Sequence, residues 1–114
     1  MKRVMWIENK GGDELAGPAR IGWVRVLARG KKLIYGDQVF LSLRGQGFKS
    51  NYFDRETKEY YWISGCHRDG RDALYGTTAV VDEDALEEYW VRIRNKPANI
   101  GVRKFRAKSK YSNR

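Results

Sequence analysis

The sequence predicts a small, mainly β domain of the α+β class that carries one helix near its C-terminus. Three observations predict this fold. Short apolar or alternating runs recur along the chain, turns rich in glycine or charge separate them, and one later stretch has helical periodicity. A chain of 114 residues has the usual size of one domain. Its hydrophobic share of 41% is enough for one modest core but not for two.

The first part of the chain has four predicted strands. They cover residues 3–8, 20–29, 32–35 and 38–43. In the first strand Val4 and Trp6 face one way, while Met5 and Ile7 face the other. Gly22 inside the second strand predicts a bend or a bulge. Gly36-Asp37 predicts a hairpin turn between the last two, because glycine adopts the positive φ that a tight turn requires.

The middle of the chain continues with a second hairpin and a loop. Residues 48–53 are predicted to pair with residues 59–64, and the polar, charged segment between them suits an exposed hairpin end. Residues 65–76 hold three glycines and are predicted to form a long loop. Thr77–Val81 is a short β-branched strand.

The helix is predicted over residues 83–95. Asp82 suits the N-cap, because its carboxylate can accept from free N–H groups of the first turn. Acidic residues crowd the first half and basic residues the end, which complements the helix dipole. Pro97 stops the helix. One apolar stripe is formed by Leu86, Tyr89, Trp90 and Ile93.

These elements together predict a small, SH3-like, partly open barrel or a twisted antiparallel sheet, with the helix packed on it. This globular domain covers residues 1–96, and a basic, partly disordered tail covers 97–114. From Lys96 onward the chain has seven Lys or Arg residues and no Asp or Glu, so the tail holds most of the net charge of +9. Apolar residues such as Phe105 can tether the first half of the tail as an added strand. Beyond Phe105 we expect disorder in the free protein.

The composition also bears on the compartment. Cys66 is the only cysteine, so no intramolecular disulfide can form and a reducing compartment is expected. No run approaches the roughly 18 apolar residues of a membrane span. The N-terminal segment reaches Glu8 before any apolar core of a signal peptide develops. We therefore expect a cytoplasmic protein with no membrane partner.

Four blocks of sequence resemble a family of small uncharacterised bacterial proteins. The blocks are GPARIG at 17–22, GFKSNYFD at 47–54, YYWISG at 60–65 and DEDALEEYW at 82–90. The resemblance covers roughly residues 4–95 and implies a bacterial source, but it carries over no function and no catalytic residue. Such sequences are sometimes labelled as a thiamine-diphosphate synthase. We reject that label, because those enzymes are several times longer and nothing in this chain could bind the cofactor.

Enzymatic chemistry has one candidate segment, the loop from Cys66 to Asp72. Cys66 and His67 suggest a nucleophile and a base, but adjacent residues on an extended chain point to opposite sides. Asp69 and Asp72 are near enough to orient His67. One Cys and one His fall short of the three or four ligands of a metal site. The residues therefore favour a binding protein without cofactors over an enzyme.

Two short motifs have alternative interpretations. Arg44-Gly45-Gln46-Gly47-Phe48 partly resembles the aromatic motif of RRM domains, but Gln46 occupies the position of a stacking aromatic. The same glycine loop, up to Lys49, can hold a phosphate or simply connect two strands. Gly36-Asp37-Gln38-Val39 is similar to a turn of translation-type SH3 barrels, and it is explained equally well as a plain hairpin turn.

The leading functional hypothesis is a non-enzymatic module that binds nucleic acid, RNA or DNA, through its tail and a basic, aromatic β surface. The predicted binding residues are Arg44, Lys49, Tyr60, Arg103, Lys104, Arg106, Lys108 and Lys110. The second hypothesis is a protein-interaction adaptor with an aromatic groove. The third is a small enzyme that uses the Cys66–Asp72 loop.

Overall fold

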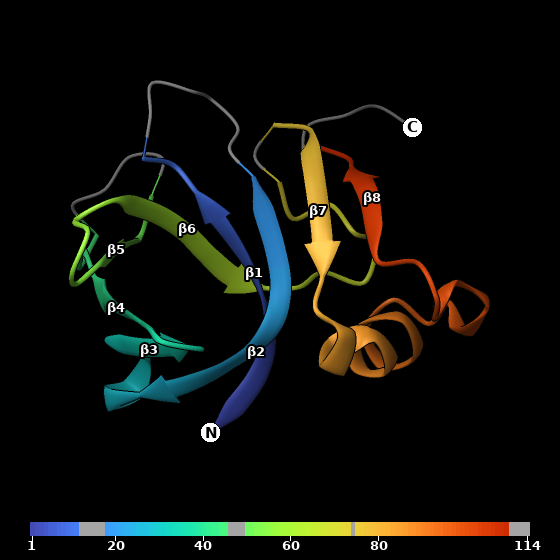
Figure 1. Ribbon diagram of the computed structural model, residues 1–114, viewed down its shortest axis with the longest axis horizontal. Helices are drawn as coiled ribbons and strands as arrows, with labels where there is room; N and C mark the ends of the chain where they lie inside the picture. The colour runs from blue at the N-terminus through green and yellow to red at the C-terminus, as the bar shows by residue number, and fades with distance from the viewer. Residues whose placement is uncertain (12–17, 46–49, 74, 110–114) are drawn as a thin grey trace.

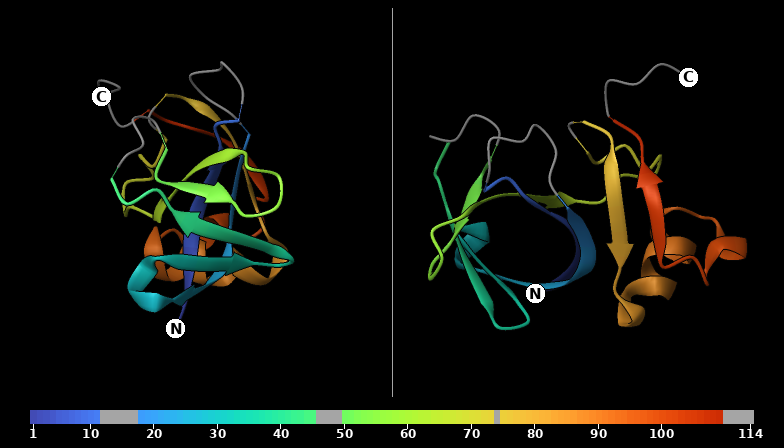
Figure 2. Two further views of the ribbon diagram at one scale, coloured as in Figure 1. Left: turned by 90° about the vertical axis from the view of Figure 1, so that its left-hand side faces the viewer. Right: turned by 45° about the horizontal axis from the view of Figure 1, so that its top comes forward.

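The structure is a computed structural model of the chain, and it describes residues 1–11, 18–45, 50–73 and 75–109. Six strands form a closed antiparallel barrel in the order β1-β6-β5-β4-β3-β2, and the pairing of β1 with β2 closes it (Figure 1; Figure 2, right). The strands are β1 (Lys2–Asn9), β2 (Ala19–Leu27), β3 (Lys32–Tyr35), β4 (Gln38–Ser42), β5 (Tyr52–Asp54) and β6 (Tyr60–Gly65). The predicted mainly β fold is confirmed, with a barrel that is closed rather than partly open.

The predicted strands and turns of the barrel are found with small changes of boundary. A 3-10 turn, η1 (Ala28–Gly30), joins β2 to β3. Gly36 has a φ of 58° in the β3–β4 turn, as the predicted hairpin requires. Strand β5 begins only at Tyr52, later than predicted, and the predicted strand start at Phe48 lies outside the described residues.

Two further strands extend the sheet beyond the barrel. Strand β7 (Thr77–Val81) pairs in parallel with the start of β2, and β8 (Lys104–Ala107) pairs antiparallel with β7. Strand β8 lies in the segment predicted as a tail, and it confirms the expectation that residues such as Phe105 can tether part of that segment as an added strand. The expected disorder beyond Phe105 is wrong for the next two residues, because Arg106 and Ala107 continue the strand and Ala107 is buried in the core. The globular body therefore extends past the predicted boundary at residue 96.

The predicted helix is present, but it is irregular. Residues 83–93 form one helical segment that begins with the 3-10 turn η2 (Glu83–Ala85) and ends with the π-helix η3 (Glu88–Ile93). It stops two residues before the predicted end, where Asn95 takes a left-handed φ of 53°. A further 3-10 turn, η4 (Pro97–Asn99), leads toward β8. None of the helices among the described residues is long and apolar enough to cross a membrane.

The core has two clusters instead of the single one expected. The barrel interior holds Met5, Ile7, Val24, Leu33, Phe40, Tyr61 and Ile63. The second cluster lies between the barrel wall, β7, β8 and the helical segment, and it includes Val4, Trp6, Ile21, Val81, Leu86, Tyr89 and Trp90. Both clusters share β1, because its alternate residues point to opposite faces and both faces are covered. Strand β1 thus contributes side chains to both cores.

Candidate functional site

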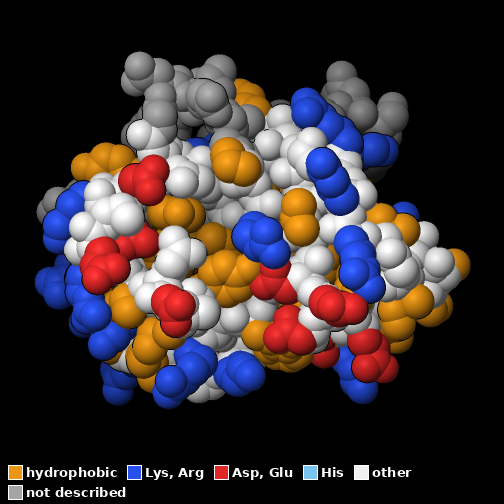
Figure 3. Space-filling model, in the orientation of Figure 1, with side chains coloured by type: hydrophobic (Ala, Val, Ile, Leu, Met, Phe, Trp, Pro, Cys, Tyr) orange, Lys and Arg blue, Asp and Glu red, His pale blue; other side chains and the backbone are white. Residues whose placement is uncertain are grey.

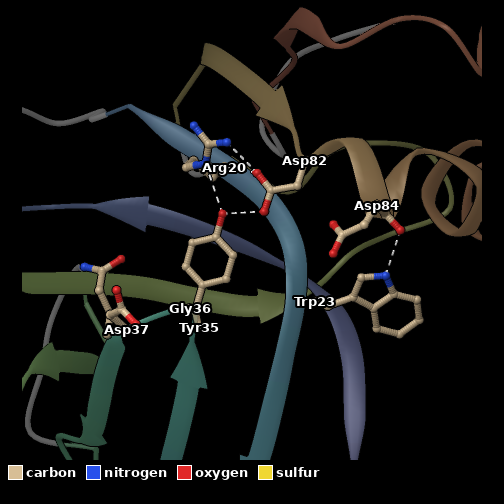
Figure 4. Close-up of a pocket in the computed structure, with 8 residues that line it drawn as sticks. Arg20, Trp23, Tyr35, Gly36, Asp37, Asp82 and Asp84 are labelled. Atoms are coloured by element: carbon tan, nitrogen blue, oxygen red, sulfur yellow. Dashed lines mark hydrogen bonds and ion pairs between the residues drawn. The ribbon is translucent and has the colours of Figure 1, made fainter.

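Strand β2 has two different neighbours along one edge. Its first residues, 19–21, pair with β7, whereas residues 25–27 pair with β3. The two neighbours diverge between these points, and the divergence opens a groove of about 530 Å³ (Figure 4). The groove is lined by Arg20, Trp23, Tyr35, Gly36, Asp37, Gln38, Asp82 and Asp84.

A three-residue network forms one wall of the groove and joins β2, β3 and the end of β7 (Figure 4). Arg20 Nη2 donates to Asp82 Oδ1 at 2.5 Å, and Arg20 Nε donates to the Tyr35 hydroxyl at 3.0 Å. The Tyr35 hydroxyl donates in turn to Asp82 Oδ2 at 2.5 Å. Burial raises the pKa of Tyr35 to about 12, and the bond to Asp82 adds to the rise. The hydrogen bond to Asp82 likewise raises the pKa of Arg20.

Gly22 makes room for this network. A Cβ at this position would collide with Asp82 Oδ2 and would lie 2.8 Å from Tyr35 Cε1. The sequence predicts a bend or a bulge at Gly22. The β1–β2 register runs without interruption past Gly22, so there is no bulge, and the missing side chain lets Asp82 and Tyr35 come close to the β2 backbone. The predicted capping bond of Asp82 is also absent, because its carboxylate is turned to Arg20 and Tyr35.

The rest of the groove combines aromatic and acidic side chains. Trp23 Nε1 donates to the Asp84 carbonyl at 3.0 Å, which ties the indole to the start of the helical segment. The Lys2 ammonium lies 5.6 Å from the centroid of the Trp23 ring. Asp37 and Asp84 are exposed, and neither forms an ion pair with any residue in the described part of the chain. The lining of the groove thus contains three carboxylates and only one guanidinium.

A basic face lies next to the groove, over β7 and β8. The register pairs Thr78 with Arg106 and Val80 with Lys104, so these four side chains share one face of the sheet. Figure 3 shows basic side chains gathered over β7 and β8, with acidic side chains below them near the start of the helical segment. We call Lys104, Arg106 and Lys108 the β8 basic row; all three are exposed.

Several neighbours hold the β8 basic row in place. Phe105 alternates with the basic residues and packs on the other face, 5.3 Å from the Trp90 ring centroid to centroid. Arg106 Nη2 donates to the Gly76 carbonyl at 3.3 Å, and the adjacent Tyr75 is exposed. Arg103, which precedes the row, forms an ion pair of 2.9 Å with Glu83. The position of strand β8 is therefore set by the core beneath it.

The structure brings only some of the predicted binding residues together. Arg44 is exposed in the turn after β4, and Tyr60 is 52% exposed at the start of β6. The end of β4 and the start of β6 lie across the barrel from β8 (Figure 1), so these two residues do not join the β8 basic row. Lys49 and Lys110 lie outside the described residues.

Sequence reasoning missed Arg20 and Tyr75. Arg20 is level with Val80 and Lys104 across β2, β7 and β8. That alignment depends on the parallel pairing of β2 with β7, two segments far apart in the sequence, and no local pattern signals it. Tyr75 is an exposed aromatic beside a glycine in a predicted loop, a signal too common to single out.

In the Cys66–Asp72 loop, the side chains that suggested chemistry contact one another or the core. His67 Nδ1 lies 2.6 Å from Asp72 Oδ1, and the His67 backbone N–H donates to the same oxygen at 2.7 Å. Cys66 packs against the second core cluster, and burial raises the pKa of its thiol, with a further rise from the charge of Asp72. A buried thiol of raised pKa is a poor nucleophile. Among the described residues there is also no group of three or more His, Cys, Asp or Glu side chains placed to hold a metal ion.

No protein-family model, no curated protein and no solved structure matches this chain. The resemblance of its four sequence blocks to a family of small bacterial proteins therefore stays a prediction.

Proposed function

We propose that the protein is a non-enzymatic nucleic-acid-binding module, and that the β7–β8 face is its binding surface. The observation that carries the proposal is the β8 basic row: Lys104 and Arg106 are exposed on one face of a strand at the edge of the sheet, and Lys108 is exposed directly after that strand. Side chains two residues apart on a strand are separated by about 7 Å. Successive cations can therefore contact successive phosphates of one nucleic-acid strand.

The surroundings of the row support the same function. Strands β7 and β8 contain no acidic residue, and Glu83 is paired with Arg103. The uncharged Thr78 and Val80 lie between the row and β2. Exposed Tyr75 stands beside Gly76, whose carbonyl accepts from Arg106, and offers a ring on which a base can stack.

Binding rather than catalysis is supported by the loop that suggested chemistry in the sequence. Cys66 is packed in the core with a raised thiol pKa, and His67 is engaged by Asp72. The single free cysteine suits a reducing compartment, and we propose a cytoplasmic location on that ground.

The test is a triple substitution that keeps the fold. We expect Lys104→Gln/Arg106→Gln/Lys108→Gln to weaken binding to single-stranded RNA and DNA of mixed sequence, without sequence preference. The slope of log affinity against log salt should become shallower by about 0.7 for each single-strand phosphate that the variant no longer binds, or about 2 for three phosphates. Fluorescence anisotropy at four salt concentrations measures both quantities.

A matched control removes the same charge elsewhere. Arg25, Arg29 and Lys31 are exposed at the far end of β2 and in the turn that follows. Changing all three to Gln should alter the salt slope much less. An equal loss in both variants would show that net charge alone drives binding, and no salt-dependent affinity in the parent protein would refute the proposal.

A further inference from the structure

We propose that the groove between β3 and β7 is a second binding site, which receives an arginine side chain of a basic peptide segment from a partner protein. The proposal is independent of nucleic-acid binding, because the groove and the β8 basic row use different residues and opposite charge. Four features of the groove carry it.

The first feature is the aromatic wall. Trp23 and Tyr35 both line the groove, and rings of this kind attract cations to their faces. The Trp23 ring already accepts the Lys2 ammonium at 5.6 Å within the protein. An incoming guanidinium can stack on such a ring through its plane while its edge N–H groups reach a carboxylate. Lysine, with a compact ammonium group, cannot make both contacts equally well.

The second feature is unused negative charge. Asp82 is already paired with Arg20, but the described residues supply no ion-pair partner for Asp37 or Asp84. In Figure 4 Asp37 lies on one side of the Tyr35 ring, and Asp84 lies next to the Trp23 indole. The two carboxylates without an ion-pair partner therefore line the groove together with its two aromatic side chains.

The third feature is that the groove has the opposite charge to the molecule as a whole. The protein has a net charge of +9, which repels a basic peptide at long range. The groove opposes that field with three carboxylates against one guanidinium. A cationic peptide would therefore be attracted here rather than to the rest of the surface, and this complementarity selects a cationic occupant over an anionic one.

The fourth feature is that the walls are held in place before any ligand arrives. The Tyr35 hydroxyl is fixed between Arg20 and Asp82, and the Trp23 indole N–H is fixed on the Asp84 carbonyl. Both aromatic walls are thus tied to the start of the helical segment. Because these side chains are already ordered, less conformational entropy is lost when a ligand binds.

The test uses an acetylated and amidated Gly-Arg-Gly-Arg-Gly peptide, with versions that carry Gln or Lys at both Arg positions. We expect the arginine peptide to shift the NMR signal of the Trp23 indole N–H, the glutamine peptide to leave it unchanged, and the lysine peptide to bind more weakly. The variant Asp37→Asn/Asp84→Asn should raise the Kd about tenfold or more, as expected for the loss of charge on hydrogen-bonded acceptors. In this variant the backbone carbonyl at position 84 still accepts from the Trp23 indole.

The matched control is Glu56→Gln/Glu87→Gln, which removes two exposed carboxylates outside the groove and should leave the peptide Kd within about twofold. Equal affinity for the arginine and lysine peptides would overturn the assignment of arginine. Absence of any indole shift, or equal weakening in both double variants, would overturn the site itself. If an oligonucleotide shifts the Trp23 signal and the arginine peptide does not, the groove belongs to the nucleic-acid interface and the peptide proposal is wrong. Failure of the β8 substitutions to affect nucleic-acid binding would leave these peptide results unchanged.

Discussion

At the scale of single residues, the absence of one side chain at Gly22 decides whether the groove can form. Asp82 and Tyr35 approach the β2 backbone where any Cβ would collide with them. Local sequence rules assign Asp82 to helix capping, since a carboxylate before a helix usually accepts from the first turn. The charged Arg20 and the half-buried Tyr35 hydroxyl are better donors here, so the carboxylate turns to them.

A substitution at Gly22 tests this account. We expect Gly22→Ala to lower the free energy of unfolding by about 1–3 kcal/mol, because the added methyl group must displace Asp82 and Tyr35. Gly101→Ala is the control, since no atom lies within 4 Å of the Cβ that would be added there. The control should change stability by no more than about 0.5 kcal/mol. Urea unfolding measures both, and equal effects would show that Asp82 and Tyr35 yield without cost.

The Asp72 carboxyl gives a prediction about pH. Burial raises its pKa, and the two hydrogen bonds from His67 offset the rise only in part. Its Oδ2 atom is buried and has no hydrogen-bond partner among the described residues. A carboxyl whose pKa is higher in the folded state binds its proton more tightly when folded. Its contribution to stability is then fully present below the ordinary pKa and is lost as the pH rises through the raised value.

The variant Asp72→Asn isolates this contribution. The amide of the variant keeps an oxygen for the His67 N–H but does not titrate. We therefore expect the parent protein to lose stability relative to the variant as the pH rises from about 4, the ordinary carboxyl pKa, through the raised pKa of Asp72. Each unit of difference between the folded and unfolded pKa contributes about 1.4 kcal/mol to that loss. Urea unfolding of both proteins at pH 4, 5, 6 and 7 measures it. A parent protein that instead gains stability relative to the variant as the pH rises would mean that the charged form is the stabilised one.

At the scale of elements, sequence periodicity predicted which face of the helical segment is buried. The predicted stripe of Leu86, Tyr89 and Trp90 is buried and Ile93 packs beside it, because apolar spacing dictates which face meets the core. The internal geometry was not predictable in the same way. The segment widens into a π-helix whose Tyr89 carbonyl accepts from the Arg94 N–H at 2.9 Å, while the Arg94 side chain bonds to the Tyr89 hydroxyl. An apolar stripe specifies which face of a helix is buried, and it does not distinguish this i→i−5 bond from the i→i−4 bonds of an α-helix.

Trp90 is the residue on which the packing of this element should depend most. It is 2% exposed, and its Nε1 atom donates to the Val102 carbonyl at 2.8 Å. We expect Trp90→Ala to cost about 3–5 kcal/mol, as large aromatic truncations in cores do. The control is Arg92→Ala on the exposed face, whose i,i+4 ion pair with Glu88 is worth only about 0.3–0.5 kcal/mol. A Trp90→Ala protein that melts within a degree or two of the parent would contradict the packing described here.

At the scale of the whole molecule, the hairpins were predictable and the closure of the fold was not. Each of the pairs β3–β4 and β5–β6 joins neighbours in sequence, so alternation and turn residues indicate them. The pairings β1–β6, β2–β7 and β7–β8 join distant segments, and periodicity does not specify which strands meet. The groove exists only where two different pairings meet on β2, and one of them, with β7, is long-range. For that reason the sequence indicated an aromatic groove in general terms but not the residues that form it.

The same long-range pairings give β8 two roles, one in the basic surface and one in the core. Its outward residues Lys104 and Arg106 belong to the β8 basic row, while Phe105 and Ala107 pack into the second core cluster. Deleting residues 103–114 should therefore lower the free energy of unfolding by more than about 3 kcal/mol, since the loss of a packed Phe ring alone costs about that much. The variant Lys104→Gln/Arg106→Gln/Lys108→Gln keeps both packed residues and should unfold close to the parent. Denaturant unfolding monitored by tryptophan fluorescence compares the two. If the deletion leaves stability unchanged, then β8 is an appendage of the barrel rather than part of its core, and loss of binding after deletion can be assigned to the removed charges alone.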